Sequence, residues 1–463
     1  MKEKSRGTFN GSIGFVLAAA GSAVGLGNIW RFPFLAARDG GGLFLVIYIV
    51  LALTFGFTLL TTEISIGRKT KQSPLTAYKK LHEKWSWIGI FACVVPFMIM
   101  PYYCAIGGWV IKYFVTFLTG SGKEAAADGY FGGFITGTVE PVIYMGIFLL
   151  ACSVIIYLGV EKGIEKTSKI MMPILFVMVV GIAVFSLTIR RTNPDGAVVT
   201  GLQGLKIFVI PRLDGIGIKE FFHVLMDALG QLFYSLSIAM GILIAYGSYM
   251  PDDANLVKSV NQIEIFDTLV AFLAGVMVIP AVYVFMGPEG MSSGPSLMFE
   301  SLPKIFAEMG VLGDIVGTVF FALVLFAAIT SGMSIMEAVV SSFMDRFKMT
   351  RTRATKIETV LALVLGLLVC FGYNFLYFEV KLPNGSTGQI LDIMDYVSNY
   401  IMMPIVAIST CILIGWVLKV DVVIDEATKN GESFGRRGFY VAMIRYIAPL
   451  LLGILLLMSI GIL

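Results

Sequence analysis

The sequence predicts an all-α, polytopic membrane protein with about eleven transmembrane helices. Hydrophobic residues make up 57% of the 463 residues and charged residues only 14%, whereas a soluble domain carries roughly 25% charge. Apolar runs long enough to cross a bilayer core of about 30 Å recur along the whole chain. The runs are continuous rather than alternating, which indicates helices rather than barrel strands. This composition excludes a soluble enzyme, a secreted disulfide scaffold and a disordered chain.

The predicted spans follow one another through short polar loops and form a single transmembrane domain over residues 1–463. They run roughly over Gly11–Ala37, Gly42–Ile66, Trp85–Leu118, Val139–Gly159, Ile170–Thr188, Phe221–Tyr249, Val257–Met286, Ile315–Phe343, Thr359–Tyr373, Met394–Leu418 and Tyr440–Leu463. The third and sixth of these exceed the roughly 20 residues of a straight span, which indicates tilt or an interruption. The five cysteines all fall inside apolar runs without close pairing, so neither a disulfide framework nor a zinc site is expected.

Lys and Arg in the loops predict the orientation, because cytoplasmic loops carry an excess of positive charge. With the N-terminus in the cytoplasm, the inner segments hold most of these residues, including the runs 68–84 and 346–356. An odd number of spans then places the C-terminus outside. The outer loop Arg190–Glu220 is the main exception. The expected location is the cell (inner) membrane, and no cleavage site for a removable signal peptide precedes the first span.

Glycine and serine fall in mid-span at two corresponding places. Gly21–Asn28 reads GSAVGLGN in the first span, and Tyr234–Gly241 reads YSLSIAMG in the sixth. Interrupted helices five spans apart favour a 5+5 inverted repeat with a binding site at the bilayer midplane, as in many transporters. The alternative is close helix packing through the small residues Gly21 and Gly25. The predicted repeats cover about residues 9–190 and 220–419, and an extra helix covers about 438–463.

Polar side chains lie inside several spans, where they are costly. Asn28 and Asp267 belong to the first and seventh spans, and Thr330 and Ser331 to the eighth. An ionisable residue at membrane depth favours a functional role, although a single Ser or Thr more often bonds the carbonyl one turn back. Sodium needs oxygen ligands, whereas the free N–H groups of a broken helix suit a carboxylate. Such a pocket would suit a zwitterion moving with sodium.

Several motifs then carry a resemblance that covers nearly the whole chain. GSIGFVLAAAGSAVGLGNIWRFP at Gly11–Pro33 closely resembles the first helix of the neurotransmitter:sodium symporter family. The resemblance continues in GGG at Gly40–Gly42, TTEISIGR up to Arg68, PYY at Pro101–Tyr103, GQLFYSLSIAMG at Gly230–Gly241, ITSGMSIMEA in the eighth span and LDIMDY at Leu391–Tyr396. It implies the leucine-transporter fold, and a bacterial amino-acid transporter that works by alternating access rather than an enzyme.

The resemblance implies two sodium sites. One would use the Ala23 carbonyl, the side chains of Asn28, Ser235 and Asp267, and the substrate carboxylate. The other would use the carbonyls of Gly21, Val24 and Ala327 with the hydroxyls of Thr330 and Ser331.

It also implies a substrate pocket between two gates. The substrate carboxylate would bind N–H groups near Leu26 and Gly27 and the Tyr103 hydroxyl, beside Ala23 and Ser235. The side-chain end would be lined by Ile99, Tyr234, Ser237, Met240, Ser331 and Ile335. The outer gate would pair Arg31 with Asp395 under the aromatic lid of Tyr103 and Tyr234. The inner gate would pair Arg6 with Asp345, supported by Ser248 and Tyr249.

Departures from the family pattern narrow the expected substrate and ions. Gly25 stands where monoamine carriers have an acidic residue, which favours amino acids over amines. Ala271 stands where chloride-dependent members have serine, and Asp267 stands where many have asparagine, so a fixed carboxylate is expected to replace chloride. Gly332 and the flexible Met240 leave room for a large side chain, and no charged residue lines that end. We therefore expect a neutral, hydrophobic or aromatic amino acid.

Two further departures concern the inner side. Phe9 stands where an inner-gate tryptophan is common. Gly163 and Pro173 resemble a helix-unwinding motif that would open a water path to the second sodium, or else mark a tolerated membrane proline.

The remaining alternatives are a sensor that binds an amino acid without moving it and an intramembrane enzyme. The sequence has no serine–histidine arrangement, and its two histidines lie away from the polar positions, which argues against the enzyme. The net charge of +3 is too small to suggest nucleic acid. The expected partners are an amino-acid substrate, sodium and the lipid bilayer, and the expected state is a monomer or weak dimer.

Overall fold

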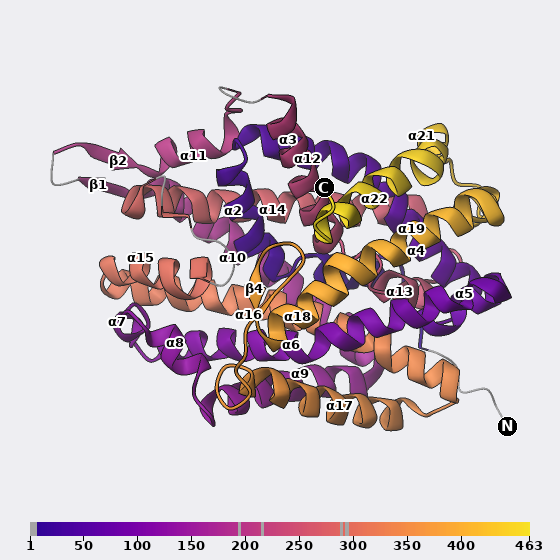
Figure 1. Cartoon of the computed structure of the whole chain (residues 1–463), viewed down its shortest axis with the longest axis horizontal. Helices are drawn as coiled ribbons and strands as arrows, with labels where there is room; N and C mark the ends of the chain where they lie inside the picture. The colour runs from indigo at the N-terminus through magenta and orange to yellow at the C-terminus, as the bar shows by residue number, and fades with distance from the viewer. Residues whose placement is uncertain (1–6, 193–195, 214–216, 288–289, 292–295) are drawn as a thin grey trace.

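The computed structural model describes residues 7–192, 196–213, 217–287, 290–291 and 296–463. Long helices run side by side along the longest axis of the molecule (Figure 1). The hairpin β1–β2 and helices α7 and α15 lie at one end of this bundle, and the N-terminus, α5 and α21 lie at the other. The expected helical, polytopic membrane architecture is therefore confirmed, with two short hairpins added to it among the described residues.

The elements of the first half of the chain begin and end as follows: α1 Ser12–Ala23, α2 Phe32–Arg38, α3 Gly42–Leu51, α4 Phe57–Thr70, α5 Pro74–Leu81, α6 Ser86–Leu118, α7 Gly122–Ala125, α8 Tyr130–Ile135, α9 Glu140–Gly159, α10 Lys166–Thr188, β1 Arg190–Thr192, β2 Val198–Thr200 and α11 Gly201–Val209. Short 3₁₀ and π-helical turns join some of these: Gly27–Arg31, Ala52–Gly56, Glu83–Trp85 and Val160–Glu165.

The second half contains α12 Ile218–Ser235, α13 Ile242–Tyr249, α14 Leu256–Met286, α15 Leu302–Glu308, α16 Val311–Phe347, α17 Arg351–Phe371, β3 Val380–Lys381, β4 Thr387–Gly388, α18 Ile390–Asp395, α19 Met403–Ile412, α20 Asp421–Ala427, α21 Arg437–Ala442 and α22 Ala448–Ser459. π-Helical turns lie at Leu297–Ser301, Tyr396–Met402, Leu413–Val417 and Met443–Ile447. Both two-stranded sheets are antiparallel, with Arg190 opposite Thr200 and Val380 opposite Gly388.

Eight helical stretches of the described residues are long and apolar enough to cross a membrane, or nine when the bent pair Ser12–Ala23 and Gly27–Arg38 is one span. Two further features reconcile this number with the predicted eleven. The stretch Glu140–Thr188 has 49 residues and turns at Gly159, whose φ of 90° suits glycine, so it holds two spans. Helices α12 and α13 are the two halves of one interrupted span.

Both predicted interruptions are present. In the first span, α1 ends at Ala23, Val24 has an extended ψ of 90°, and the chain bends by 55° before the helix resumes at Gly27. In the sixth span the helix stops at Ser235 and resumes at Ile242. The glycines also allow close packing: a Cβ on Gly21 would lie 3.2 Å from the Thr330 Cβ. Break and close packing therefore occur together rather than as alternatives.

The helices differ in how far they are enclosed. The most apolar part of Glu83–Leu118 is 72% buried, against 22% for Arg437–Ser459 and 33% for Glu140–Thr188. Helix α6 packs along α16 in the interior, and α1 packs against α10, α14 and α16. The interrupted first span is thus surrounded by long helices, while α9, α10 and α22 present apolar side chains outward.

Two segments differ in detail from the sequence-based expectations. The loop Arg190–Glu220, predicted to lie outside, contains the β1–β2 hairpin and α11. There the backbone N–H of Thr200 donates to Gln203 Oε1 at 2.9 Å and caps the helix. Helix α10 continues through Pro173, with only a π-helical turn before it. In this conformation Pro173 is thus a tolerated membrane proline rather than a point of unwinding.

Candidate functional site

A cluster of buried oxygens joins the first, sixth and seventh spans. The Asp267 carboxylate accepts hydrogen bonds from Asn28 Nδ2 at 2.9 Å and from Ser235 Oγ at 2.8 Å on one oxygen. Its other oxygen accepts from the Tyr48 hydroxyl at 3.1 Å. Asn28 and Asp267 are fully buried. We call Asn28, Ser235 and Asp267 the first oxygen cluster; with the neighbouring Ala23, it contains the residues predicted for one sodium site.

The charge of the first oxygen cluster is unbalanced. No Lys, Arg or His of the described residues forms an ion pair with Asp267. A buried carboxylate without a countercharge is costly, whereas a hard cation bound by carboxylate, amide and hydroxyl oxygens would compensate it. The donor set therefore fits a sodium ion.

A second oxygen cluster lies where α16 meets the end of α1. The Ser331 hydroxyl is 3.3 Å from the Gly21 carbonyl oxygen and 3.5 Å from that of Val24. The Thr330 hydroxyl donates to the Ala327 carbonyl at 3.1 Å. These five residues, our second oxygen cluster, are those predicted for the other sodium site. They offer only neutral oxygens, two of them freed by the break in the first span.

The two breaks enclose a small cavity of about 30 Å³. The eleven residues predicted to bind substrate all line it: Ala23, Leu26, Gly27, Ile99, Tyr103, Tyr234, Ser235, Ser237, Met240, Ser331 and Ile335. Ser22, Gly25 and Asn28 complete the wall. An amino acid needs a larger space, so binding requires movement of the lining side chains.

Tyr103 has an unsatisfied group beside this cavity. Its hydroxyl is buried and makes no hydrogen bond with any described residue. A Cβ built on Gly25 would lie 3.8 Å from this hydroxyl and 2.9 Å from Ser331 Oγ. Tyr103 is thus available to donate to a ligand carboxylate. A Cβ at position 25 would require the Ser331 hydroxyl to move.

Polar contacts tie the two interrupted spans together. Ser22 Oγ and Ser237 Oγ are 3.1 Å apart, and Gln231 Nε2 donates to the Gly27 carbonyl at 3.1 Å. From α4, Glu63 Oε1 accepts from the backbone N–H of Ala239 at 2.7 Å. The bonds from Gln231 and to Glu63 satisfy backbone groups that the breaks leave without helical partners.

Sequence reasoning missed two of these contributors: Tyr48 and Glu63. A charged side chain inside the second span was a usable signal for Glu63. Tyr48 gave no such signal, because its importance depends on which helices meet.

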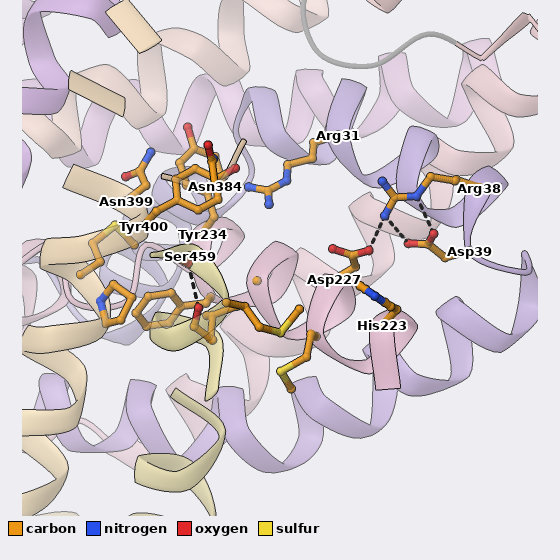
Figure 2. A pocket seen from close by; sticks show the side chains of 17 residues that line it. Arg31, Arg38, Asp39, His223, Asp227, Tyr234, Asn384, Asn399, Tyr400 and Ser459 are labelled. Atoms are coloured by element: carbon orange, nitrogen blue, oxygen red, sulfur yellow. Dashed lines mark hydrogen bonds and ion pairs between the residues drawn. The ribbon is translucent and has the colours of Figure 1, made fainter. Parts of the chain in front are cut away.

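The predicted outer gate faces a wider pocket of about 480 Å³ (Figure 2). Arg31 lies 6.0 Å from the ring centres of both Tyr234 and Tyr400, within cation–π distance. Asp395 instead accepts from the Tyr102 hydroxyl at 3.1 Å and from Asn399 Nδ2 at 2.6 Å. In the described residues Arg31 and Asp395 therefore interact only at longer range, and no ion pair closes this gate directly.

A second charged group lies farther out in the same pocket. Figure 2 shows Arg38 between Asp39 and Asp227, bonded to both. The distance from Arg38 Nε to Asp39 Oδ1 is 2.6 Å. This pair of carboxylates neutralises Arg38 and leaves Arg31 as the cation nearest the aromatic lid.

Residues of the predicted inner gate have several partners. Arg6 lies outside the described residues. Asp345 Oδ2 accepts from the Ser73 backbone N–H at 2.6 Å. Ser248 Oγ donates to the Ala245 carbonyl of its own helix at 2.6 Å, while the Tyr249 hydroxyl donates to a glutamate of α16.

That glutamate, Glu337, was missed by sequence reasoning. It is fully buried, accepts from Tyr249 at 2.7 Å and binds Arg351 through two bonds of 2.6 and 2.8 Å. The pair links α13, α16 and α17 near the inner gate. Phe9 packs edge-on against Tyr246 and Tyr249, in the place where a tryptophan was expected from the resemblance.

Comparisons with known proteins agree with this arrangement. The fold matches the crystal structure of MhsT in complex with L-phenylalanine with a TM-score of 0.85 and 31% identity, over 98% of this chain and 100% of that one. An uncharacterized sodium-dependent transporter of Bacillus subtilis, YhdH, is 32% identical over 477 aligned positions and the full length of both chains. An uncharacterized sodium-dependent transporter of Methanocaldococcus jannaschii is 32% identical over 93% of this chain and 86% of its own.

The pattern that defines the sodium:neurotransmitter symporter family matches residues 6–123 and 135–462. Nearly the whole chain is covered, including both interrupted spans and the helices that pack around them. The protein is a multi-pass, sodium-dependent membrane transporter and not an enzyme. It belongs to the sodium:neurotransmitter symporter family.

Proposed function

We propose that this transporter carries a neutral, hydrophobic or aromatic amino acid together with sodium, by alternating access and without chloride. One observation carries the proposal. A single cavity between the two broken helices is bordered by both oxygen clusters and by the Tyr103 hydroxyl, which has no hydrogen-bond partner among the described residues. A zwitterion has a carboxylate for the helix N–H groups and for Tyr103, and that carboxylate can also approach sodium at Asp267.

The side-chain end of the cavity supports the proposed substrate class. Ile99, Met240 and Ile335 are apolar, and none of the described residues that line the cavity is charged. A charged substrate side chain would lose its hydration there without compensation. The matching MhsT structure is a complex with L-phenylalanine, which is an amino acid of this class.

Asp267 is the reason to propose independence from chloride. Its carboxylate would supply next to sodium the negative charge that a chloride ion supplies elsewhere. The neighbouring Ala271 has no hydroxyl to hold an anion, and it is fully buried. Two sodium ions are proposed, one at each oxygen cluster.

The proposed cycle has the N-terminus inside and the C-terminus outside, with the two repeats at about 9–190 and 220–419. Sodium completes the amino-acid site in an outward-facing state. Arg31 and Asp395 then close the outer path, directly or through water. Loss of the contacts of Asp345 opens the inner path, and Arg6 is its proposed partner.

Uptake of radiolabelled amino acids into proteoliposomes tests the proposal. With an inward sodium gradient, phenylalanine, leucine, tryptophan and tyrosine should be taken up or compete, while glutamate and lysine should not. Replacement of chloride by gluconate should leave uptake unchanged. Binding without uptake would instead favour a sensor, and displacement only by the charged amino acids would contradict the proposed substrate class.

A further inference from the structure

Helix α17 carries a carboxyl group that has no place in the proposed sodium or amino-acid sites. Glu358 is fully buried, and neither of its oxygens has a hydrogen-bond partner among the described residues. It lies seven residues from the start of α17 at Arg351, about 10 Å along the helix. A buried, unpaired acid inside a membrane span is costly and is by default a functional candidate.

The surroundings of Glu358 offer no countercharge. On α17 itself, Arg353 and Lys356 are exposed, whereas Arg351 is held by Glu337. Helix α17 packs against α6, α9 and α16. The titratable groups that these helices bring near are thiols: Cys93 and Cys104 of α6 lie within electrostatic range of Glu358, and Cys152 of α9 lies beside Cys104.

These neighbours favour a proton over a metal cation as the ligand. A metal cation needs several oxygens, but the titratable neighbours are thiols, and Ser342 beside Cys93 donates its hydroxyl to the Ala338 carbonyl at 2.7 Å. A carboxyl without partners in a low-dielectric interior is far less costly as the neutral acid. The proton is thus the only countercharge that the site needs.

A polar route leads from Glu358 toward the end of the bundle where the inner gate lies. Thr355 is one turn earlier on the same face of α17, and its buried hydroxyl also has no partner. Cys93 is seven residues from the start of α6, and Ser342 is five residues from the end of α16. Asp345 of the inner gate follows Ser342 by one turn. All three helices therefore approach Glu358 close to the gate.

We propose that Glu358 is a proton-binding site that holds its proton while the inner path is closed and releases it to the cytoplasmic side when the inner ends of α6, α16 and α17 separate. The O–H bond of the acid breaks, the proton passes to water, and the carboxylate remains until the path closes again. The inference deepens the proposed function, because it rests on alternating access and adds protons on the inner side as regulators of that cycle.

Infrared spectroscopy of the purified full-length protein in lipid tests the first half of the proposal. The carbonyl band of protonated carboxylic acids should be weaker in Glu358→Gln than in the wild type, because the variant lacks the acid of Glu358. Glu358→Asp keeps a carboxylic acid and should shift the frequency of the band. This variant provides the test if the glutamine variant does not fold. Glu165→Gln is the matched control: Glu165 is equally buried but is paired with Lys169 at 2.6 Å, so the band should remain. An identical band in the wild type and in the foldable Glu358 variant would overturn the proposal.

Opening the inner path tests the second half. In Asp345→Ala the contribution of Glu358 to the band should disappear as the pH is raised through neutrality, because water then reaches Glu358, while in the wild type it should persist. A band that persists equally in both proteins would overturn the proposed release. The infrared spectra are recorded without transport, so they decide the role of Glu358 independently of uptake. An absence of sodium-driven uptake would contradict only the proposed function.

Discussion

Replacement of Asp267 by asparagine removes the negative charge of the first oxygen cluster but keeps its geometry. The carboxylate accepts three hydrogen bonds, from Asn28, Ser235 and Tyr48. In Asp267→Asn the amide oxygen can keep the bonds from Asn28 and Ser235, and the amide N–H can donate to the Tyr48 oxygen. The fold and the oxygen ligand should therefore survive, and only the negative charge is lost.

The magnitude follows from the loss of one charged partner. Hydrogen bonds and contacts to a charged group contribute about 1.5–3 kcal/mol, against about 1 kcal/mol for neutral ones. Because the amide keeps a neutral contact, the loss is the difference, about 0.5–2 kcal/mol. This weakens sodium binding by about 2- to 30-fold, since about 1.4 kcal/mol is tenfold. If the carboxylate replaces chloride, part of this loss should be recovered when chloride is added to the variant.

The assay is uptake of labelled phenylalanine into proteoliposomes as external sodium is varied, in chloride and in gluconate. Wild-type protein should give one sodium curve in both salts. The variant should need more sodium, and more in gluconate than in chloride. An unchanged sodium requirement in Asp267→Asn, or a chloride requirement in the wild type, would refute the reasoning.

Four further predictions test other parts of the structure. Ser331→Ala together with Thr330→Ala should abolish the sodium dependence of uptake, and an unaltered sodium curve would exclude the second oxygen cluster. Gly25→Ala should weaken phenylalanine binding, because its Cβ would lie 2.9 Å from Ser331 Oγ. The control Gly146→Ala, whose Cβ would meet nothing within 4 Å, should bind phenylalanine normally. Equal affinities of the two variants would argue against the collision at position 25. Arg351→Met should lower the free energy of unfolding by about 3–5 kcal/mol, because Glu337 is left buried and unpaired, and the added change Glu337→Met should recover most of it; a melting temperature equal to wild type would contradict this. Hydrogen bonds from Lys429 and Lys71 hold the pKa of Asp252 below its ordinary value, so this exposed carboxylate stabilises the fold above pH of about 4 and loses that contribution in stronger acid. Asp252→Asn should reduce the acid-induced loss of unfolding free energy by at most about 1 kcal/mol, and an unchanged dependence of that free energy on pH would refute the assignment.

The architecture was largely predictable from the sequence, because each apolar run must form a helix in lipid regardless of its neighbours. The breaks in the first and sixth spans were also predictable, since Gly21, Gly25 and the serines of the sixth span weaken the helical ladder locally. The resemblance to a family then brought together residues that are far apart in the chain, such as Ser331 and Gly21.

Other features depend on tertiary contacts that no local pattern encodes. Helix α11 looked like a polar loop because its stability depends on packing against α3 and α14. Asp395 accepts hydrogen bonds from Tyr102 and Asn399 and does not pair with Arg31. This pairing depends on how α6 packs against α18. The partners of Glu337 lie on two other helices, so the sequence could flag its charge but not its pairing. Cavity size is likewise a property of side-chain packing rather than of residue identity.

The central claim is that sodium and amino acid bind to one site formed by two broken helices, and equilibrium binding to the purified protein tests it most directly. Phenylalanine affinity should rise with sodium, and sodium affinity should rise with phenylalanine by the same factor, as linkage requires. Equal phenylalanine affinities with and without sodium would contradict the claim.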